Sequence, residues 1–290
     1  MFTGSTALAD YLIVLPVVLG LIGAALALML RRLAPALALI MVAAIVACDV
    51  GLVLRVLETG PISMTMGRWL PPFGISFAVD MFGASFALAA AVATLMVLIY
   101  GLGERAEQGF YPAVLLLLAG VSGAFLTGDL FNLYVWFEVM LIASFALMVL
   151  GGRPLQLDGA VKYGFLNFLA TSFFLVGLGL LYGTLGTLNM ADIITRAPGA
   201  NPAAMLGVAA LMLLAFGIKA AVVPLNGWLP ASYHTPPAAV SALLAGLLTK
   251  VGAYAMLRVL VMLLPAARDQ LDGLLTVIAI ATLLLGPLGA

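Results

Sequence analysis

The chain has 290 residues, of which 65% are hydrophobic and only 8% charged, and its twelve basic residues balance twelve acidic ones. This composition excludes a soluble domain, which needs charged surface, and the zero net charge offers nucleic acid no electrostatic footprint. A single cysteine and a single histidine exclude an internal disulfide and a multi-histidine metal cage, so we expect neither a metal nor a cofactor.

Long apolar runs without alternation predict an all-α integral membrane protein rather than a β-barrel. The criterion of about twenty apolar residues per span gives nine candidates in chain order. They are expected at 8–30, 35–56, 78–101, 110–127, 130–151, 161–186, 203–235, 237–262 and 270–289. Only short connections separate them, so we predict one transmembrane domain over 1–290, a polytopic helix bundle.

The first loop suggests an orientation in the membrane. Arg31 and Arg32 directly follow the first span, and the positive-inside rule favours placing such a pair on the inner side. Across all loops the basic residues divide evenly between the two sides. The expectation that the N-terminus lies outside therefore rests on this pair.

Some charges lie near the ends of spans, where a side chain can reach the lipid headgroups at little cost. Asp80 and Lys162 are of this kind. Asp49 lies deeper, and two interpretations stay open for it: a side chain that reaches outward, or a functional carboxylate. We keep Asp49 and Lys162 as secondary candidates for proton transfer.

Three charges lie well inside apolar segments: Glu138, Lys219 and Lys250. Glu138 is eight residues into its span, or about 12 Å at 1.5 Å per residue, and Lys250 follows Pro237 by thirteen residues, or about 20 Å. A charge at such depth costs roughly 2.5–3.5 kcal/mol on insertion, so it normally pairs with another or lines a hydrated path. A static pair needs one partner each, and here two lysines meet one glutamate. This surplus favours a functional role.

Pro224 predicts a break in the run 203–235, which is too long for one ordinary span. Proline removes a backbone donor and clashes with the carbonyl four residues back, and Pro224 follows Lys219 by five residues. A broken helix at membrane depth is tolerated only where it lines a cavity or is buried in protein, and its ends interact with ions. This arrangement is typical of a transporter.

Two stretches resemble a known family. The first, 127-TGDLFNLYVWFEVMLIASFALMVLGG-152, resembles helix five of the antiporter-like subunits shared by Mrp-type sodium/proton antiporters and respiratory complex I. The second, 217-GIKAAVVPLNGWLPASYHTPPAAVSALLAGLLTKVGAY-254, resembles their helices seven and eight, with the break and both lysines in register. The residues of both stretches are most similar to the D-type branch of the Mrp antiporters.

The resemblance implies roles for four residues. Glu138 matches the carboxylate of a buried pair, Lys219 its partner in the discontinuous helix seven, and Lys250 the central lysine of helix eight. His234 lies where a bridging proton carrier between the lysines is expected, and histidine suits a relay because it titrates near neutral pH.

The resemblance also implies a division of the chain. Helices one to three would occupy 1–101, the first of two inverted repeats (helices four to eight) 110–262, and the start of the second repeat 270–290. The family has fourteen helices, whereas this sequence stops at Ala290. We therefore expect a partial chain rather than a protein that has lost its second half.

The function that follows is proton conduction within a multisubunit sodium/proton antiporter of the cell membrane, in a bacterial plasma membrane. Its partners would be other subunits, protons, Na⁺ and lipid. Pairing of Lys219 with Glu138 favours the charged form of both groups, and separation favours the neutral forms. Two alternatives remain: a proton-pumping subunit of a complex I-like quinone reductase or membrane hydrogenase, and a structural subunit whose buried charges only hold helices together.

Overall fold

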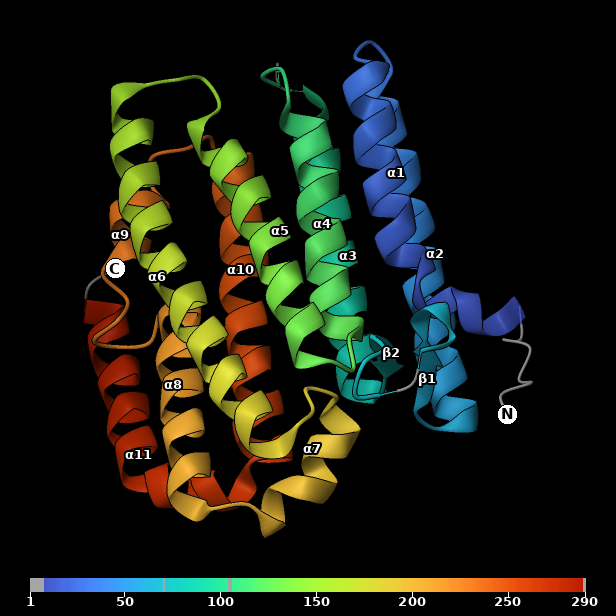
Figure 1. Cartoon of the computed structure of the whole chain (residues 1–290). Coiled ribbons are helices and arrows are strands. Elements are labelled where there is room, and N and C mark those ends of the chain that lie inside the picture. Colours follow the sequence, from blue (N-terminus) through green and yellow to red (C-terminus); the bar gives the residue numbers. More distant parts are fainter. Residues whose placement is uncertain (1–7, 70, 104–105, 289–290) are drawn as a thin grey trace.

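The computed structural model describes residues 8–69, 71–103 and 106–288, which form a bundle of helices (Figure 1). Its long helices are α1 (Leu15–Met29), α2 (Ala34–Thr59), α3 (Met81–Tyr100), α4 (Phe110–Leu126), α5 (Leu130–Val149), α6 (Pro154–Leu185), α8 (Pro202–Ala220), α10 (Ala238–Met256) and α11 (Pro265–Leu288). Within the described residues seven helices are long and apolar enough to cross a membrane, and α1 and α4 are shorter apolar helices. The predicted all-α membrane bundle is confirmed. The outermost predicted residues, 1–7 and 289–290, lie outside the described part.

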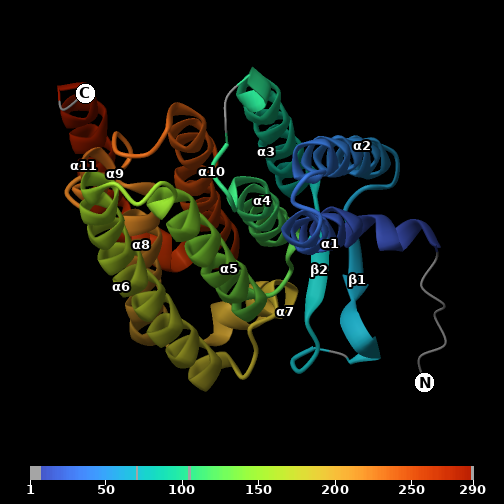
Figure 2. The ribbon, with the colours of Figure 1, turned by 90° about the horizontal axis from the view of Figure 1, so that it is seen from above.

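Helix α4 is the centre of the bundle. It packs against α1, α2, α3, α5 and α10, and every residue from Leu117 to Leu126 is buried. Seen along the bundle, α1 to α3 lie on one side of α4, and α5, α6 and α8 lie on the other (Figure 2). A helix that is apolar all round is the kind that can occupy such a position.

The ends of the helices carry short elements that hydropathy cannot detect. Strands β1 (Ile62–Thr65) and β2 (Ser76–Val79) pair antiparallel, with Ile62 opposite Val79. Helix α7 (Met190–Arg196) lies between α6 and α8, and α9 (Trp228–Ser232) lies between α8 and α10. Helix α10 continues into η5 (Leu257–Leu263), a π-helical segment. The 3₁₀ segments are η1 (Leu8–Ile13), η2 (Met66–Arg68), η3 (Gly101–Gly103) and η4 (Ala197–Gly199).

Two predicted helix starts were wrong. The first span was expected from residue 8, but α1 begins only at Leu15, and η1 leaves its axis sideways (Figure 1). Pro16 in the first turn of α1 explains this, because a helix cannot run back through a proline that clashes with the carbonyl four residues earlier. Helix α6 begins at Pro154, seven residues before the expected 161, with Gln156 accepting a hydrogen bond from the Arg153 amide at 3.1 Å. Proline at a first helical position starts a helix well.

Candidate functional site

The start of α5 is held by side chains of the TGDLFN stretch. Asp129 is the N-cap of α5 and accepts from the Asn132 amide at 2.9 Å, while the Asn132 side chain donates to the Thr127 hydroxyl at 3.0 Å. These bonds satisfy backbone donors that a helix start leaves free. They also fix the level of α5 in the bundle, and with it the depth of Glu138, eight residues further on.

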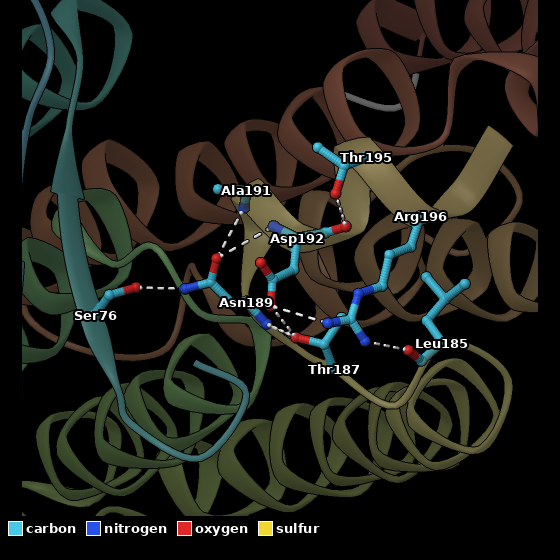
Figure 3. A network of polar contacts seen from close by, with 8 residues as sticks. All are labelled: Ser76, Leu185, Thr187, Asn189, Ala191, Asp192, Thr195 and Arg196. Atoms are coloured by element: carbon cyan, nitrogen blue, oxygen red, sulfur yellow. Dashed lines mark hydrogen bonds and ion pairs between the residues drawn. The ribbon is translucent and has the colours of Figure 1, made fainter. Parts of the chain in front are cut away.

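The backbone beside this cap is tied to two other segments. Gly128 donates to the Ser76 carbonyl of β2 at 2.9 Å, and the Gly128 carbonyl accepts from Met190 of α7 at 2.9 Å. In Figure 3 the Asn189 side chain points from the start of α7 to the Ser76 hydroxyl, to which it donates at 2.7 Å. This network cross-links β2, α5 and α7 at one end of the bundle. It forms a rigid base for the site.

The same network closes the turn between α6 and α7. The Asn189 side chain accepts from the amides of Ala191 and Asp192 at 3.1 and 3.3 Å, and caps α7 (Figure 3). Thr187 donates to Asp192 at 3.0 Å, and Arg196 donates to the Leu185 carbonyl at 3.0 Å. The charges of this turn are thus used for local structure.

The predicted break near Pro224 is present. Helix α8 ends at Ala220, Ala221 has a left-handed backbone (φ 55°), and helical structure resumes only at Trp228 in α9. A left-handed alanine costs about 1–2 kcal/mol, so the surrounding structure must hold it in place. Figure 1 shows α8 and α9 as two separate pieces joined by the loop.

The backbone groups freed by the break find partners inside the protein. The Trp228 indole donates to the Ile218 carbonyl at 2.8 Å, and the Val223 amide donates to the Thr282 hydroxyl of α11 at 3.1 Å. This satisfies the requirement that non-helical backbone at membrane depth be buried in protein or line a cavity.

Lys219 lies in the last turn of α8 and is only 8% exposed. The negative end of the helix dipole favours a cation at this position, and the ammonium group lies 5.1 Å from the centre of the Phe137 ring. A cavity of about 10 Å³ adjoins it, lined partly by Tyr163 and Asn167 of α6. This volume is close to the minimum that holds one water molecule, about 10–15 Å³.

Glu138 acts on Lys219 through space. The charge of the carboxylate favours the ammonium form of Lys219, although no carboxylate of the described residues lies within 4.0 Å of its nitrogen. Glu138 is half-buried, and its Oε1 atom has no hydrogen-bond partner among the described residues. The two groups are therefore electrostatically coupled but not locked in a direct ion pair.

Helix α10 approaches Lys219 through Gly252, and Lys250 lies on another face. A Cβ atom on Gly252 would lie 2.7 Å from the Lys219 carbonyl carbon, so the two helices touch there. Lys250 is two residues away, a rotation of about 200° on a helix. Its side chain is exposed, donates to the Ala245 carbonyl at 2.6 Å, and lines a groove of about 260 Å³ with Ser85 of α3. The structure does not bring Lys250 next to Lys219.

His234 lies at the turn between α9 and α10. Its side chain is exposed and Nδ1 is 2.8 Å from the Pro230 carbonyl oxygen. Lys250 lies twelve residues inside α10 from its first residue, Ala238, or about 18 Å along the helix. His234 is therefore at the end of the bundle and not directly between the two lysines.

The secondary candidates differ from each other. Lys162 is exposed and forms a surface ion pair of 2.6 Å with Asp158, one turn earlier in α6. Asp49 has no exposed surface, so a side chain that reaches outward is wrong. Both of its carboxylate oxygens are buried and lack a hydrogen-bond partner among the described residues.

One buried charge cluster was not predicted. Arg258 of η5 donates to both carboxylate oxygens of Asp80, at 2.8 and 2.5 Å, and to the Tyr254 hydroxyl at 2.5 Å. Asp80 also caps α3 by accepting from Gly83 at 2.8 Å. Burial opposes ionisation of Asp80, but the hydrogen bonds from Arg258 and Gly83 outweigh it and hold its pKa below the ordinary value. The expectation that Asp80 reaches the headgroups is wrong. An N-cap aspartate and a deep arginine were visible in the sequence, but not their proximity.

Known proteins are similar to this chain over most of its length. The family model "NADH:quinone oxidoreductase/Mrp antiporter, TM" matches residues 127–290. The Na(+)/H(+) antiporter protein of the D type from Bacillus subtilis (strain 168) is 43% identical over 244 residues, 82% of this chain and 50% of the relative. The protein of the same name from Alkalihalophilus pseudofirmus is 41% identical over 244 residues, with the same coverage. The chain thus spans about half the length of the curated relatives it matches.

Solved structures share the fold. A chain of the Mrp complex from Dietzia sp. DQ12-45-1b has a TM-score of 0.83 and 34% identity, covering 89% of this chain and 49% of the other. A chain of the membrane-bound sulfane sulfur reductase, an archaeal respiratory membrane complex, has a TM-score of 0.85 and 31% identity, covering 93% and 57%. A chain of respiratory complex I from Thermus thermophilus has a TM-score of 0.69 and 25% identity, covering 85% and 52%. From the broken helix, the buried lysine and these matches, we conclude that the chain belongs to the NADH:quinone oxidoreductase/Mrp antiporter transmembrane family.

Proposed function

We propose that this chain is the proton-conducting subunit of a multisubunit cation/proton antiporter that exchanges Na⁺ for protons, and that it is a transporter subunit rather than an enzyme. The observation that carries the proposal is Lys219, a buried lysine at the end of a broken membrane helix, within the field of the half-buried Glu138. The relatives named as Na⁺/H⁺ antiporter subunits support the choice of ions.

The chemistry at this pair is a switch of charge. A proton that reaches Glu138 neutralises the carboxylate and removes the field that favours the Lys219 ammonium form. Burial then favours the neutral amine, and Lys219 releases its proton into the adjoining cavity. Because no direct bond joins the two groups, the switch requires no ion pair to be pulled apart.

The proton moves on through His234 and Lys250 in this proposal. Both are exposed in the part of the bundle that the structure describes, and neither touches Lys219, so hydrated space must connect them. The groove beside Lys250, about 260 Å³, is large enough for several water molecules. Lys250 would receive the proton on the far face of α10, and His234 would exchange it at the end of the bundle.

The setting belongs to the same proposal. Helices α4 to α10, within 110–262, form the first antiporter repeat, residues 1–101 precede it, and 270–290 begin a second. The chain lies in a bacterial plasma membrane with its N-terminus outside, and other subunits of a hetero-oligomeric complex adjoin it. A multisubunit setting is supported by the similarity to a chain of an Mrp complex.

A second candidate function has its own support. The high TM-score to a chain of a sulfane sulfur reductase, 0.85, favours a proton-pumping subunit of a redox-driven membrane complex. In that case the same pair would move protons in response to electron transfer elsewhere in the complex, without a need for Na⁺.

The test uses inverted membrane vesicles that carry the complete complex, from cells without other antiporters. A pH-sensitive dye reports whether Na⁺ collapses an imposed proton gradient, in the parent, in Lys219→Ala and in Asp158→Asn, a surface control. We expect collapse in the parent and the control, and none in Lys219→Ala at equal amounts of assembled complex. Collapse in Lys219→Ala would overturn the switch. Absence of a Na⁺ response in the parent, together with a gradient formed on addition of an electron donor, would establish the redox candidate instead.

A further inference from the structure

A set of buried polar groups lies outside the proposed relay. Apart from one nitrogen of Arg268 on α11, the buried side-chain atoms without a hydrogen-bond partner among the described residues belong to Asp49, Ser122, Trp136 and Glu138. Asp49 and Ser122 have no exposed surface. Buried polar groups are normally satisfied, so four such side chains in one bundle call for an explanation.

The four groups lie at nearly the same depth. The position of a Cβ on Gly23 of α1 is within 3.4 Å of both Met41 of α2 and Leu115 of α4, so these two residues share a level. Helices α2 and α4 run in the same direction (Figure 1). Asp49 is eight residues beyond Met41 and Ser122 seven beyond Leu115, about 12 and 10.5 Å along their helices.

Helix α5 continues the row at this level. The Trp136 ring packs directly against Gly123, the residue after Ser122, and the backbone at 136–140 packs against Gly120. Glu138 is two residues from Trp136, about 3 Å along α5. All four groups therefore fall within about one helical turn of depth, some 5 Å.

Their faces point toward shared seams. Ser122 belongs to the same stripe of α4 as Leu115 and Ala119, which pack against the glycines of α1, whereas the Gly123 side faces α5. Asp49 belongs to the buried stripe of α2, which includes Ile45 and Leu52. The row thus runs from α2 around α4 to α5, which spans two interhelical spacings, or about 16–20 Å.

The N-terminus of α1 reaches the same level. Gly20 packs against Ala119, and Leu15, the first residue of α1, lies five residues further toward the end of the bundle where α4 stops. Five residues are about 7.5 Å, which places Leu15 level with Asp49 to within about 2 Å. A helix N-terminus favours negative charge, so the anionic form of Asp49 has electrostatic support there.

We propose that Asp49 is a further proton-transfer residue, which feeds Glu138 along the row formed by Ser122 and Trp136. The proposal rests on the function proposed above. Asp49 takes up a proton on a carboxylate oxygen and releases it as its O–H bond breaks, leaving the carboxylate. Water in the row carries the proton, Ser122 both donates and accepts a hydrogen bond, and the Trp136 N–H only donates. Protons thereby reach Glu138 from the three N-terminal helices.

A purely structural Asp49 makes the opposite prediction. An acid that is buried without partners destabilises the fold, so an apolar residue of similar size should be tolerated or even stabilising if charge has no role. A proton carrier cannot be replaced in this way. Asp49→Leu therefore separates the two cases, while Asp49→Asn keeps the shape and Asp49→Glu keeps the acid.

The experiment measures Na⁺-driven exchange of the complete complex in vesicles, and the infrared spectrum of the purified complex. We expect Asp49→Asn and Asp49→Leu to exchange at least about tenfold more slowly than the parent, Asp49→Glu to retain part of the rate, and Asp158→Asn to match the parent. Ser122→Ala should slow exchange as well. The C=O band of a protonated carboxylic acid in the parent should be absent in Asp49→Asn and retained in Ser122→Ala.

The outcomes separate this proposal from the proposed function. Exchange at the parent rate in Asp49→Asn and Asp49→Leu would overturn the role of Asp49 while antiport itself stands. If the parent shows no response to Na⁺, the antiporter function fails. The infrared comparison then decides alone, and an unchanged carboxylic acid band in Asp49→Asn would overturn the proposal.

Discussion

The contact between α8 and α10 at Gly252 allows a sharp test of how Lys219 is held. A Cβ atom at this position would lie 2.6 Å from the Ala220 nitrogen, 2.7 Å from the Lys219 carbonyl carbon and 2.9 Å from the Lys219 Cβ. Non-bonded heavy atoms prefer about 3.5–4.0 Å, so Gly252→Ala must push the helices apart by roughly 1 Å. Two of the three atoms are backbone, which cannot rotate away. We expect a loss of about 1–3 kcal/mol in the free energy of unfolding.

Gly207 provides the matched control for this substitution. It lies in α8, and an added Cβ there would meet nothing within 4 Å. Gly207→Ala should be neutral or stabilise the helix by up to about 1 kcal/mol, because alanine has the higher helix propensity. Thermal unfolding of the purified complex in detergent measures both variants, and the vesicle assay measures exchange. The reasoning is refuted if Gly252→Ala unfolds and exchanges like Gly207→Ala.

Further predictions concern the charge cluster and the support of Lys219. Arg258→Ala should cost about 3 kcal/mol in thermal unfolding, the low end for a buried pair, because the Asp80 side chain keeps 27% of its surface exposed; a loss below 1 kcal/mol would contradict the buried pair. Since the pKa of Asp80 is lowered, its contribution to stability is complete above the ordinary carboxyl range, near pH 4, and is lost as the pH falls through the lowered pKa. Unfolding curves of Asp80→Asn at several pH values should lack this acid-dependent part. Trp228→Phe should cost about 1–3 kcal/mol, because it leaves a carbonyl of the broken helix without its donor; unchanged unfolding would show that another group satisfies it. Phe137→Leu removes the ring beneath the Lys219 ammonium group and should cost about 0.5–2 kcal/mol with slower exchange, whereas an unchanged rate would exclude a role for the ring.

Features that depend on local composition could be predicted from the sequence. The apolar runs predicted the membrane helices, and a proline in an overlong run predicted the break after Lys219. A single charge inside an apolar segment stands out for the same reason, because each insertion cost is a property of one residue. Glu138 and Lys219 were found in this way.

Features that depend on contacts between distant segments could not be predicted. Asp80 and Arg258 are 178 residues apart, and Asn189 reaches Ser76 across 113 residues. Hydropathy ranks each of these residues separately and does not indicate which ones meet. The hairpin and α7 are too short to have a spanning signal. The burial of Asp49 depends on the rotation of α2 against its neighbours, which the sequence left open.

The central claim is that Lys219 exchanges its proton under the control of Glu138, and the most direct measurement compares a charge swap with the parent. The double variant Glu138→Lys with Lys219→Glu keeps one acid and one base, but it places the acid at the negative end of α8 and the lysine outside it. Na⁺-driven proton exchange would be measured in vesicles with equal amounts of assembled complex. We expect the swap to assemble and to be inactive. Exchange at the parent rate would show that the two charges only hold the helices together, and would contradict the account.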